Sequence, residues 1–285
     1  MISGPRLAFL GVAALAILVA IAYSRHTRDD SLSRLREAGV VRIGYAVEPP
    51  YAFLTPSGQI TGEAPEIAKH VVAALAIPHI EWRQTEFSQL ISELEDGRID
   101  VIAAGMFVTE QRARRVRFSH PTLRVRPGLL VARGNPKGIH TLRQAVSEGD
   151  ARFTALAGSV EEDLLRRLGV KGPRLLAVPD ALTGLKAVES GLADALLLSE
   201  PTVAWMANGD ALGHTERADA GETSGNDAYG QVAFAFRHGD EALARAWDEV
   251  LAGYLGSGKH RALLARLGML APGPRGPGGN GGNTP

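Results

Sequence analysis

The run Ile99-Asp100-Val101-Ile102-Ala103-Ala104 (IDVIAA) is a nearly continuous apolar stretch of strand length. Such a run is typical of a parallel strand that is buried on both faces of a sheet. An apolar helical stripe lies just before it, within residues 90–94, and Gly97 marks the end of that helix. A helix that leads into a buried strand is the repeating unit of α/β proteins, so this stretch predicts a parallel sheet covered by helices.

The same alternation extends in both directions from this run. Hydrophobic periodicity predicts strands at 40–44, 153–157, 175–178, 194–198 and 230–236, and helices at 66–76, 160–168, 181–190, 240–254 and 259–267. Their order indicates two such units, and the last strand follows the second unit. A chain that leaves one lobe, builds another and then returns has two crossing segments, which we expect to act as hinges at Val125–Leu129 and Asp227–Val232.

Composition excludes several classes of protein. The 31 basic and 31 acidic side chains give a formal net charge of zero, whereas nucleic-acid binding needs a surplus of Lys and Arg. The absence of Cys excludes disulfides, Cys-ligated metals, thiol nucleophiles and a lipid-modified N-terminal Cys. The eight His show no metal-binding spacing, and neither a phosphate-binding loop nor a nucleophile elbow is present. We therefore predict no cofactor, no metal and no catalytic residue.

The two ends of the chain differ from its middle. Leu7–Tyr23 is an apolar run of 17 residues, which fits either an export signal or a short membrane anchor, and less well a buried helix. Ala20-Ile21-Ala22 favours cleavage, whereas Arg25 and Arg28 favour a retained anchor. Either of the first two readings places the rest of the chain outside the cytoplasmic membrane. Pro272–Pro285 holds ten Gly or Pro in 14 residues and is expected to be disordered.

Polar and aromatic side chains follow the first predicted strand, where α/β sheets bind ligands. Glu48 and Tyr51 come after the strand at 40–44. They either face a cleft or belong to a turn in which Tyr51 supports the sheet. The sequence leaves both readings open.

Two helix starts follow other strands. Thr109 is a plausible N-cap that places Arg112 in a first turn, where its guanidinium serves either an anion site or a surface acid. Ser159 has capping-box spacing to Glu162, which by itself is structural. It becomes functional if a ligand anion sits on Ser159 and the Val160 amide.

These segments together resemble a known family. Gly44–Phe53 (GYAVEPPYAF), Gly62–Ala68, Leu94–Gly105 (LEDGRIDVIAAG) and Thr109–Arg112 look like the extracytoplasmic solute-binding proteins of polar amino-acid ABC importers. TGEAPEIAK and DVIAAGMFVT look like the ectoine/hydroxyectoine-binding branch in particular. The resemblance implies an α/β protein with a two-lobed periplasmic-binding-protein-like fold of type II, in which a two-segment hinge joins two parallel-rich sheets.

The resemblance also implies a ligand site. Tyr51, Phe87 and Phe107 would form an aromatic box, Arg112 would bind a carboxylate and Glu48 would bind amidinium N–H groups. Aromatic faces attract a delocalised cation, and a buried zwitterion needs a partner for each charge. A core position at a helix start is the other reading of Phe87. The predicted ligand-binding residues are Glu48, Tyr51, Phe87, Phe107, Thr109, Arg112, Ser159, Val160 and Ser199.

One departure from the amino-acid binders concerns the strand at 194–198. Those proteins usually present an Asp after it for the ligand's ammonium group, whereas here Ser199-Glu200-Pro201 follows. Asp194 lies at the strand start, too early for that role. Unless Glu200 takes the place of that Asp, the ammonium group of an ordinary amino acid has no partner, which favours a compatible solute as the ligand.

The resemblance thus predicts a solute receptor of an ABC importer. The expected organisation is a signal peptide or anchor at 1–28, a first lobe at 29–127 with its return segment at 230–271, a second lobe at 128–229 and a tail at 272–285. The expected partners are a zwitterionic solute and a membrane permease, with the receptor a monomer. The alternatives are a polar amino-acid receptor, a dehydratase-like enzyme with Glu161 as general acid, and a membrane-tethered signalling subunit.

Overall fold

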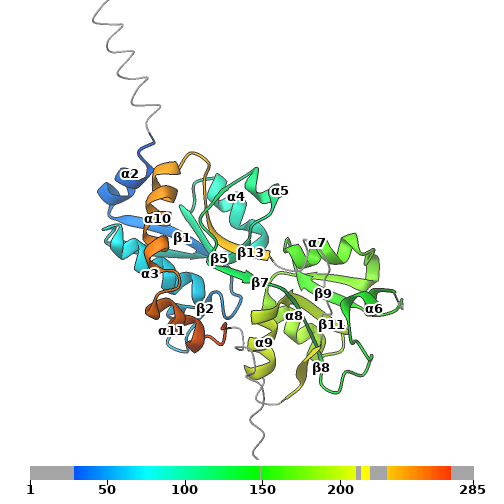
Figure 1. Cartoon of the computed structure of the whole chain (residues 1–285). Coiled ribbons are helices and arrows are strands. Elements are labelled where there is room, and N and C mark those ends of the chain that lie inside the picture. Colours follow the sequence, from blue (N-terminus) through cyan, green and yellow to red (C-terminus); the bar gives the residue numbers. More distant parts are fainter. Residues whose placement is uncertain (1–28, 148, 210–212, 219–229, 271–285) are drawn as a thin grey trace, which may run out of the picture.

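The structure is a computed structural model that describes residues 29–147, 149–209, 213–218 and 230–270. The predicted signal or anchor at 1–28 and the predicted tail at 272–285 lie outside these residues. Within them, the chain forms two large sheets and one small two-stranded sheet. Figure 1 shows the elements of the first sheet at the upper left and those of the second at the lower right, with β7 between them.

The first sheet has six strands in the order β4-β1-β5-β13-β6, and β7 pairs with β13 outside this path. Its strands are β1 (Val40–Tyr45), β4 (His79–Gln84), β5 (Val101–Phe107), β6 (Arg117–Phe118), β7 (Leu123–Val125) and β13 (Gly230–Phe236). The helices of this part are α2 (Ser31–Ala38), α3 (Glu63–Ala74), η1 (Phe87–Gln89), α4 (Leu90–Glu95), α5 (Glu110–Ala113), α10 (Glu241–Tyr254) and α11 (Gly258–Arg266). The small sheet pairs β2 (Phe53–Leu54) with β3 (Ile60–Thr61).

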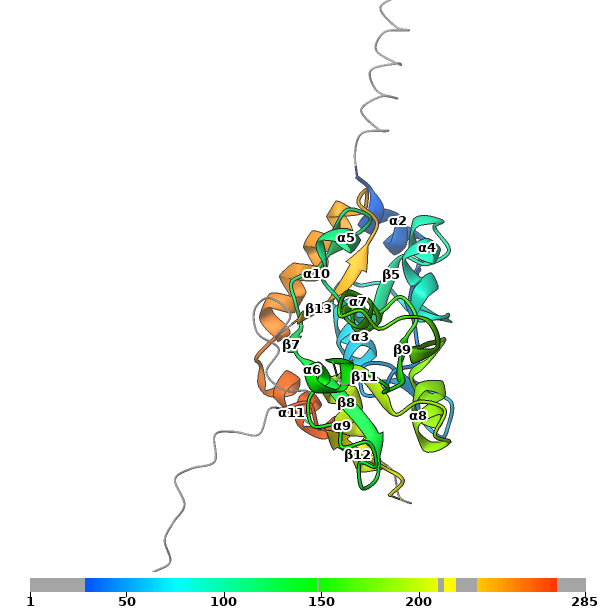
Figure 2. The same ribbon diagram turned by 90° about the vertical axis from the view of Figure 1, so that its right-hand side faces the viewer.

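The second sheet has five strands in the order β10-β9-β11-β8-β12. These strands are β8 (Pro127–Ala132), β9 (Phe153–Leu156), β10 (Leu175–Val178), β11 (Ala195–Ser199) and β12 (Thr215–Ala218). The helices are α6 (Leu142–Ser147), α7 (Val160–Arg167), η2 (Gly172–Arg174), α8 (Ala181–Glu189) and α9 (Glu200–Gly209). Figure 2 shows α2, α4, α5 and α10 at one end of the molecule and α6, α8, α9 and β12 at the other.

The α/β prediction is confirmed, but neither sheet is wholly parallel. β5 is parallel to β1 and antiparallel to β13, and β11 is parallel to β9 and antiparallel to β8. Each sheet is therefore mixed: it contains the parallel strands that the sequence predicted together with strands that run antiparallel to them. Gly97, at a φ of 69°, ends the helix before β5 as its position predicted.

The chain passes from the first sheet to the second between β7 and β8, at Arg126. This point lies inside the predicted hinge Val125–Leu129. Half of the predicted return hinge, residues 227–229, lies outside the described part of the chain, and the other half begins β13. The two hinges and the predicted domain boundaries remain predictions. The two sheets nevertheless share a hydrophobic cluster, in which Leu90 and Ile102 of the first lie with Leu130 and Leu196 of the second.

The same ion pair recurs at the start of a central strand in each sheet. Asp100 accepts from the backbone N–H, Nε and Nη2 of Arg42, at 3.0, 3.0 and 2.7 Å. Asp194 accepts from the same three atoms of Arg152, at 2.8, 3.1 and 2.9 Å. Burial alone would raise the pKa of Asp194, but the bonds from Arg152 hold that pKa below its ordinary value. Asp194 is therefore held by Arg152 at the start of β11, away from the strand end where a partner of a ligand's ammonium group was expected.

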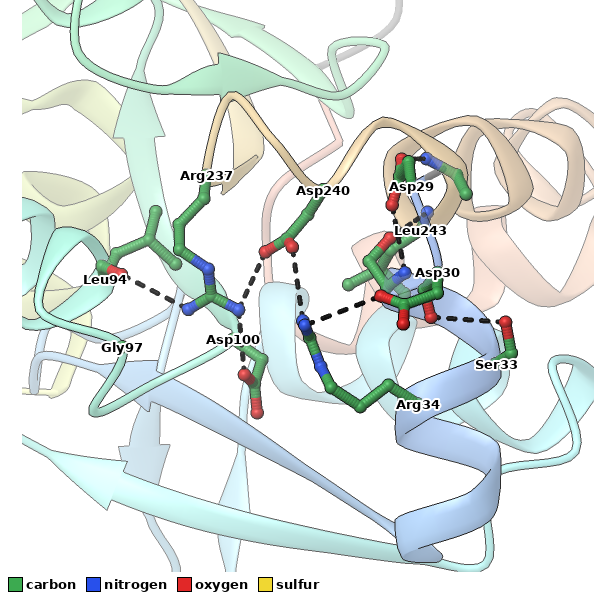
Figure 3. Close-up of polar contacts among 12 residues, drawn as sticks. Asp29, Asp30, Ser33, Arg34, Leu94, Gly97, Asp100, Arg237, Asp240 and Leu243 are labelled. Atoms are coloured by element: carbon green, nitrogen blue, oxygen red, sulfur yellow. Dashed lines mark hydrogen bonds and ion pairs between the residues drawn. The ribbon is translucent and has the colours of Figure 1, made fainter. Parts of the chain in front are cut away.

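In the first sheet this ion pair extends into a network, shown in Figure 3. Arg237 donates to Asp100 at 2.9 Å and pairs with Asp240 at 2.7 Å. Arg34 of α2 donates to the same Asp240 at 3.4 Å. The network fastens the first described helix and the start of α10 to the start of the central strand β5.

None of the helices described is both long and apolar enough to cross a membrane.

Candidate functional site

The predicted site residues stand where strands of the two sheets end. Phe107 is the last residue of β5, and Glu48 follows β1. Ser159 precedes α7 shortly after β9, and Ser199 is the last residue of β11. Side chains from both sheets meet here, which is the region where α/β proteins bind their ligands.

Arg112 connects the two sheets through backbone carbonyls. Thr109 caps α5 by accepting from the Arg112 backbone N–H at 3.2 Å, which fixes the direction of the arginine. Arg112 Nη1 donates to the Phe107 carbonyl at 2.8 Å, and Nη2 donates to the Gly158 carbonyl at 2.9 Å. Gly158 belongs to the loop before α7, so one guanidinium spans the boundary between the sheets.

Tyr51 and Phe107 lie in one apolar cluster, and each packs against a glycine. A Cβ on Gly105 would lie 2.5 Å from Tyr51 Cγ, so only glycine leaves room for the Tyr51 ring. A Cβ on Gly230 would lie inside the van der Waals radius of the Phe107 ring. Tyr51 is buried, and its hydroxyl has no hydrogen-bond partner among the described residues. These two rings form one wall of the site.

Phe87 lies apart from the other two rings. It begins η1 and packs with Leu90 in the hydrophobic cluster that the two sheets share. This packing agrees with the alternative interpretation of Phe87 as a core residue at a helix start. Its ring also faces the guanidinium of Arg112, whose Cζ lies 5.3 Å from the ring centroid. Phe87 is therefore positioned to hold Arg112, and its place in an aromatic box remains a prediction.

Glu48 reaches the second sheet through Thr202, which sequence reasoning missed. Thr202 Oγ1 donates to Glu48 Oε1 at 2.8 Å and lies 3.1 Å from Ser199 Oγ. All three side chains are buried. Thr202 lies in α9, one helical turn after Ser199. A helix predicted directly after Ser199 would have placed Thr202 beside it and indicated Thr202 as a site residue.

Ser159 and Glu161 form the start of α7. The Ser159 hydroxyl accepts from the Glu162 backbone N–H at 3.1 Å, which is the first bond of the predicted capping box. Glu162 Oε2 accepts from the Gly158 N–H at 2.7 Å, whereas the second bond of a capping box would come from the N–H of Ser159 itself. The side chain of Glu161 is buried beside this cap, and Val160 is half-buried next to it. The site thus contains an acid from each sheet, Glu48 and Glu161.

Burial and like charge shift the titration of these groups. Burial and the nearby Glu161 raise the pKa of Glu48 to about 8, against the hydrogen bond from Thr202. Burial also raises the pKa of Glu161, although its own backbone N–H, Arg112 and Ser159 oppose the shift. Burial lowers the pKa of Arg112, while Glu161 and Asp163 oppose that shift. Glu48 and Glu161 thus both have a raised pKa near one arginine, so a positively charged group of a ligand would stabilise their ionised forms.

A pocket of about 620 Å³ lies next to this site between the two sheets, although Glu48, Tyr51 and Arg112 do not line it. Phe107, Thr109, Val160 and Glu161 line it, together with Gly230. Its size suits a small molecule, and its walls carry both apolar and ionic groups. Within the described residues, no group of three His, Asp or Glu is arranged to hold a metal ion.

The structure brings Glu48, Tyr51, Phe107, Arg112 and Ser199 to one region, and their role in ligand binding remains a prediction. Glu200 does not join them, because its carboxylate pairs with Arg217 of β12. Sequence reasoning missed Thr202 and the Gly158 carbonyl.

Comparison with known proteins supports this organisation. The profile of "Bacterial extracellular solute-binding proteins, family 3" matches residues 41–268. The chain is 29% identical over 179 residues to the probable amino-acid ABC transporter periplasmic-binding protein y4tE of Sinorhizobium fredii, an alignment that covers 62% of this chain and 59% of that protein. It is 25% identical to the L-cystine-binding protein TcyJ of Escherichia coli K12, over 90% of this chain and 93% of that protein.

An enzyme and two solved structures are also similar. Cyclohexadienyl dehydratase of Pseudomonas aeruginosa is 26% identical, over 65% of this chain and 69% of that enzyme. The crystal structure of EhuB in complex with hydroxyectoine has a TM-score of 0.77 at 29% identity, and the match covers 84% of this chain and 92% of that one. The ancestral amino acid-binding protein AncCDT-1 has a TM-score of 0.73 at 22% identity, over 83% and 98% of the two chains, which shows a shared fold.

Proposed function

The chain belongs to the bacterial extracellular solute-binding proteins of family 3, and from this premise we propose that it captures a small zwitterionic solute for an ABC importer. The ligand we propose is a compatible solute of the ectoine type. The observation that carries the proposal is the set of opposite charges at the boundary of the two sheets, where Glu161 interacts electrostatically with both Arg112 and Glu48. The likeness to EhuB, solved with hydroxyectoine, supports the same ligand class.

In this proposal each charge of the ligand has a partner. The ligand's carboxylate binds the guanidinium of Arg112, which now donates only to backbone carbonyls. Its amidinium binds Glu48, over the faces of Tyr51 and Phe107. Buried charges are tolerated only when they are paired, so a zwitterion of this size would be retained where a neutral sugar would not.

Ligand capture is coupled to closure of the two lobes. The bonds from Arg112 to Gly158 and from Thr202 to Glu48 already join the sheets, and both contacts lie in the proposed site. We propose that the predicted boundaries of the two lobes and the hinge segments describe this motion, and that a membrane permease recognises the closed form. The receptor would act as a monomer on the outer face of the cytoplasmic membrane, either secreted or held by Leu7–Tyr23.

Calorimetry with the purified protein tests the ligand class. The panel contains ectoine, hydroxyectoine, glycine betaine, L-cystine, L-glutamine and L-arginine. A ligand present at about 100 times its dissociation constant stabilises the fold by roughly 2.7 kcal/mol, so a thermal melt gives a second readout. Binding restricted to ordinary amino acids would exclude the ectoine-type ligand and retain the receptor.

An enzyme is the second candidate, and one observation favours it. Glu161 is buried in the pocket and its pKa is raised, as a general acid requires. The similar cyclohexadienyl dehydratase carries out chemistry in a related chain. Turnover of a cyclohexadienyl substrate that is lost in E161Q while binding persists would support this candidate, and no turnover in the wild type would exclude it.

A further inference from the structure

The carboxylate of Glu48 is buried with fewer partners than a buried charge needs. Glu48 is 7% exposed, and within the described part of the chain Thr202 Oγ1, at 2.8 Å, is the one group that donates a hydrogen bond to its carboxylate. No Lys, Arg or His of the same part forms an ion pair with it. A buried carboxylate is tolerated when cations or several donors pair with it. Glu48 can therefore accept further hydrogen bonds from a ligand.

The two hydroxyl groups beside Glu48 have a fixed direction. Thr202 has one hydroxyl hydrogen, which it donates to Glu48 Oε1. The contact of 3.1 Å between Thr202 Oγ1 and Ser199 Oγ therefore takes its hydrogen from Ser199. Ser199, Thr202 and Glu48 thus form a chain in which each hydroxyl hydrogen is already used, and hydrogen bonds in such a chain strengthen one another. The chain offers a ligand acceptor atoms and no donor.

The two ends of this hydrogen-bonded chain belong to different sheets, and the backbone holds each of them. Glu48 stands in a tight turn, where its carbonyl accepts from the Tyr51 N–H at 2.9 Å. Ser199 is the last residue of β11 and pairs with Pro127 of β8. A hydroxyl group of the second sheet thus orients a carboxylate that follows a strand of the first. The complete arrangement therefore exists only while the two sheets are in contact.

On the basis of the proposed function, we propose that Ser199, Thr202 and Glu48 form a subsite that selects ligand cations with N–H groups over quaternary ammonium ions. Thr202 is the positioning residue, because it orients the Glu48 carboxylate across the boundary of the sheets. An amidinium or guanidinium group can donate to the remaining acceptor positions of that carboxylate. A quaternary ammonium ion has the charge but no hydrogen to donate, so it leaves these buried acceptors unsatisfied.

The test compares ligand preference between matched variants. Calorimetry measures the affinity for ectoine, for L-arginine and for glycine betaine, whose cation is a quaternary ammonium ion. T202V removes the hydroxyl and keeps the shape of the side chain, whereas T202S keeps the hydroxyl. T154V is the control, because Thr154 is also buried and donates to the Leu176 carbonyl at 2.9 Å within the second sheet. Circular dichroism with a thermal melt verifies that each variant is folded.

We expect the wild type to prefer ectoine to glycine betaine strongly, and T202V to lower this preference at least tenfold. T202S and T154V should stay within threefold of the wild type. In the E48Q background, T202V should change ectoine affinity less than threefold, because the carboxylate that Thr202 orients is gone. A wild type that prefers glycine betaine, an unchanged preference in T202V, or the full loss on T202V in the E48Q background would overturn the proposal.

The wild type reports separately on the proposed function. If it binds L-arginine and no ectoine, the ectoine-type ligand fails. Loss of L-arginine binding in T202V, with normal binding in T202S and T154V, would then still support the subsite. A wild type that binds none of the three ligands would overturn both the subsite and the ectoine-type ligand.

Discussion

The ring of Trp205 lies 5.1 Å from the ring of Phe53, centroid to centroid, with an angle of 50° between their planes. Trp205 belongs to α9 beside the second sheet, and Phe53 belongs to the small β2–β3 sheet beside the first. The pair therefore joins the two lobes at a place apart from Arg112. Aromatic pairs of this kind contribute about 0.5–1.5 kcal/mol, and any opening of the cleft at this edge must separate them.

Trp205 is expected to report lobe closure by fluorescence. It is half-buried against Phe53, whereas Trp247 is fully buried in the first core. Ligand addition should shift the emission to shorter wavelength, and W205F should lose that shift. W82F is the control, since Trp82 contacts Tyr45 within the first lobe. A ligand-dependent shift that persists in W205F would contradict the assignment.

Removal of the Arg112 side chain is expected to weaken binding of a carboxylated ligand by about 100-fold or more. The loss reflects the charge-assisted hydrogen bonds to the ligand together with the bridge to the Gly158 carbonyl. Calorimetry on R112A provides the measurement. R115A is the matched control, because Arg115 pairs with Glu95 at the surface, and its affinity should equal that of the wild type. Unchanged affinity in R112A would place the carboxylate elsewhere.

Glu48 is expected to make stability fall as pH rises. Its folded pKa of about 8 lies above the ordinary value of 4.5, so the folded form keeps a proton that the unfolded form releases. The stabilisation is complete below about pH 4.5 and disappears as pH approaches 8, with each pKa unit corresponding to about 1.36 kcal/mol at most. Urea unfolding from pH 5 to pH 9 should show a flatter profile for E48Q. E37Q, at an exposed position, should keep the wild-type slope.

The same protonation predicts how ligand affinity changes with pH. Glu161 and Thr202 act on the pKa of Glu48, and a cationic ligand favours the ionised carboxylate. Ectoine binding should therefore release protons near neutral pH and tighten severalfold from pH 6 to pH 8. Calorimetry in buffers of different ionisation enthalpy measures the released protons. Equal heats in all buffers would show that Glu48 does not titrate on binding.

A methyl group at Gly230 is expected to damage the site more than the fold. The added Cβ would overlap the Phe107 ring, which would have to move toward the pocket. We expect G230A to weaken ectoine binding at least tenfold. G253A provides the control, because a Cβ there meets nothing in α10, and it should bind normally with slightly higher stability. Wild-type affinity in G230A would show that the ring position is unimportant.

The central strands and their helices were predictable because their patterns are continuous. β5 and β11 are apolar runs, and Gly97 ends the helix before β5 by its conformation. β4 was missed because it is an edge strand in which only Ile80 and Trp82 alternate with polar residues, and neither is fully buried. β13 was predicted as a strand, but its antiparallel pairing and that of β8 depend on which strands are neighbours, which periodicity does not contain.

The site was predictable only in part, for a similar reason. Arg112 and Glu48 follow strands directly, so their region was evident from the order of elements. Thr202 joins Glu48 only because α9 brings it there from the other sheet, a contact between distant parts of the chain. The ring of Phe87 faces the guanidinium of Arg112, and this orientation depends on side-chain packing that the sequence does not reveal.

The place of β13 in the first sheet has a consequence for the order in which the molecule folds. This strand, Gly230–Phe236, lies between β5 and β6, although every strand of the second sheet precedes it in the chain. A polypeptide that emerges from its N-terminus can finish the second sheet while the first still lacks its fourth strand. Until Gly230 arrives, the Phe107 ring lacks the contact with that residue, which also lines the pocket. A chain that ends at residue 229 would therefore contain every strand of the second sheet and an incomplete pocket.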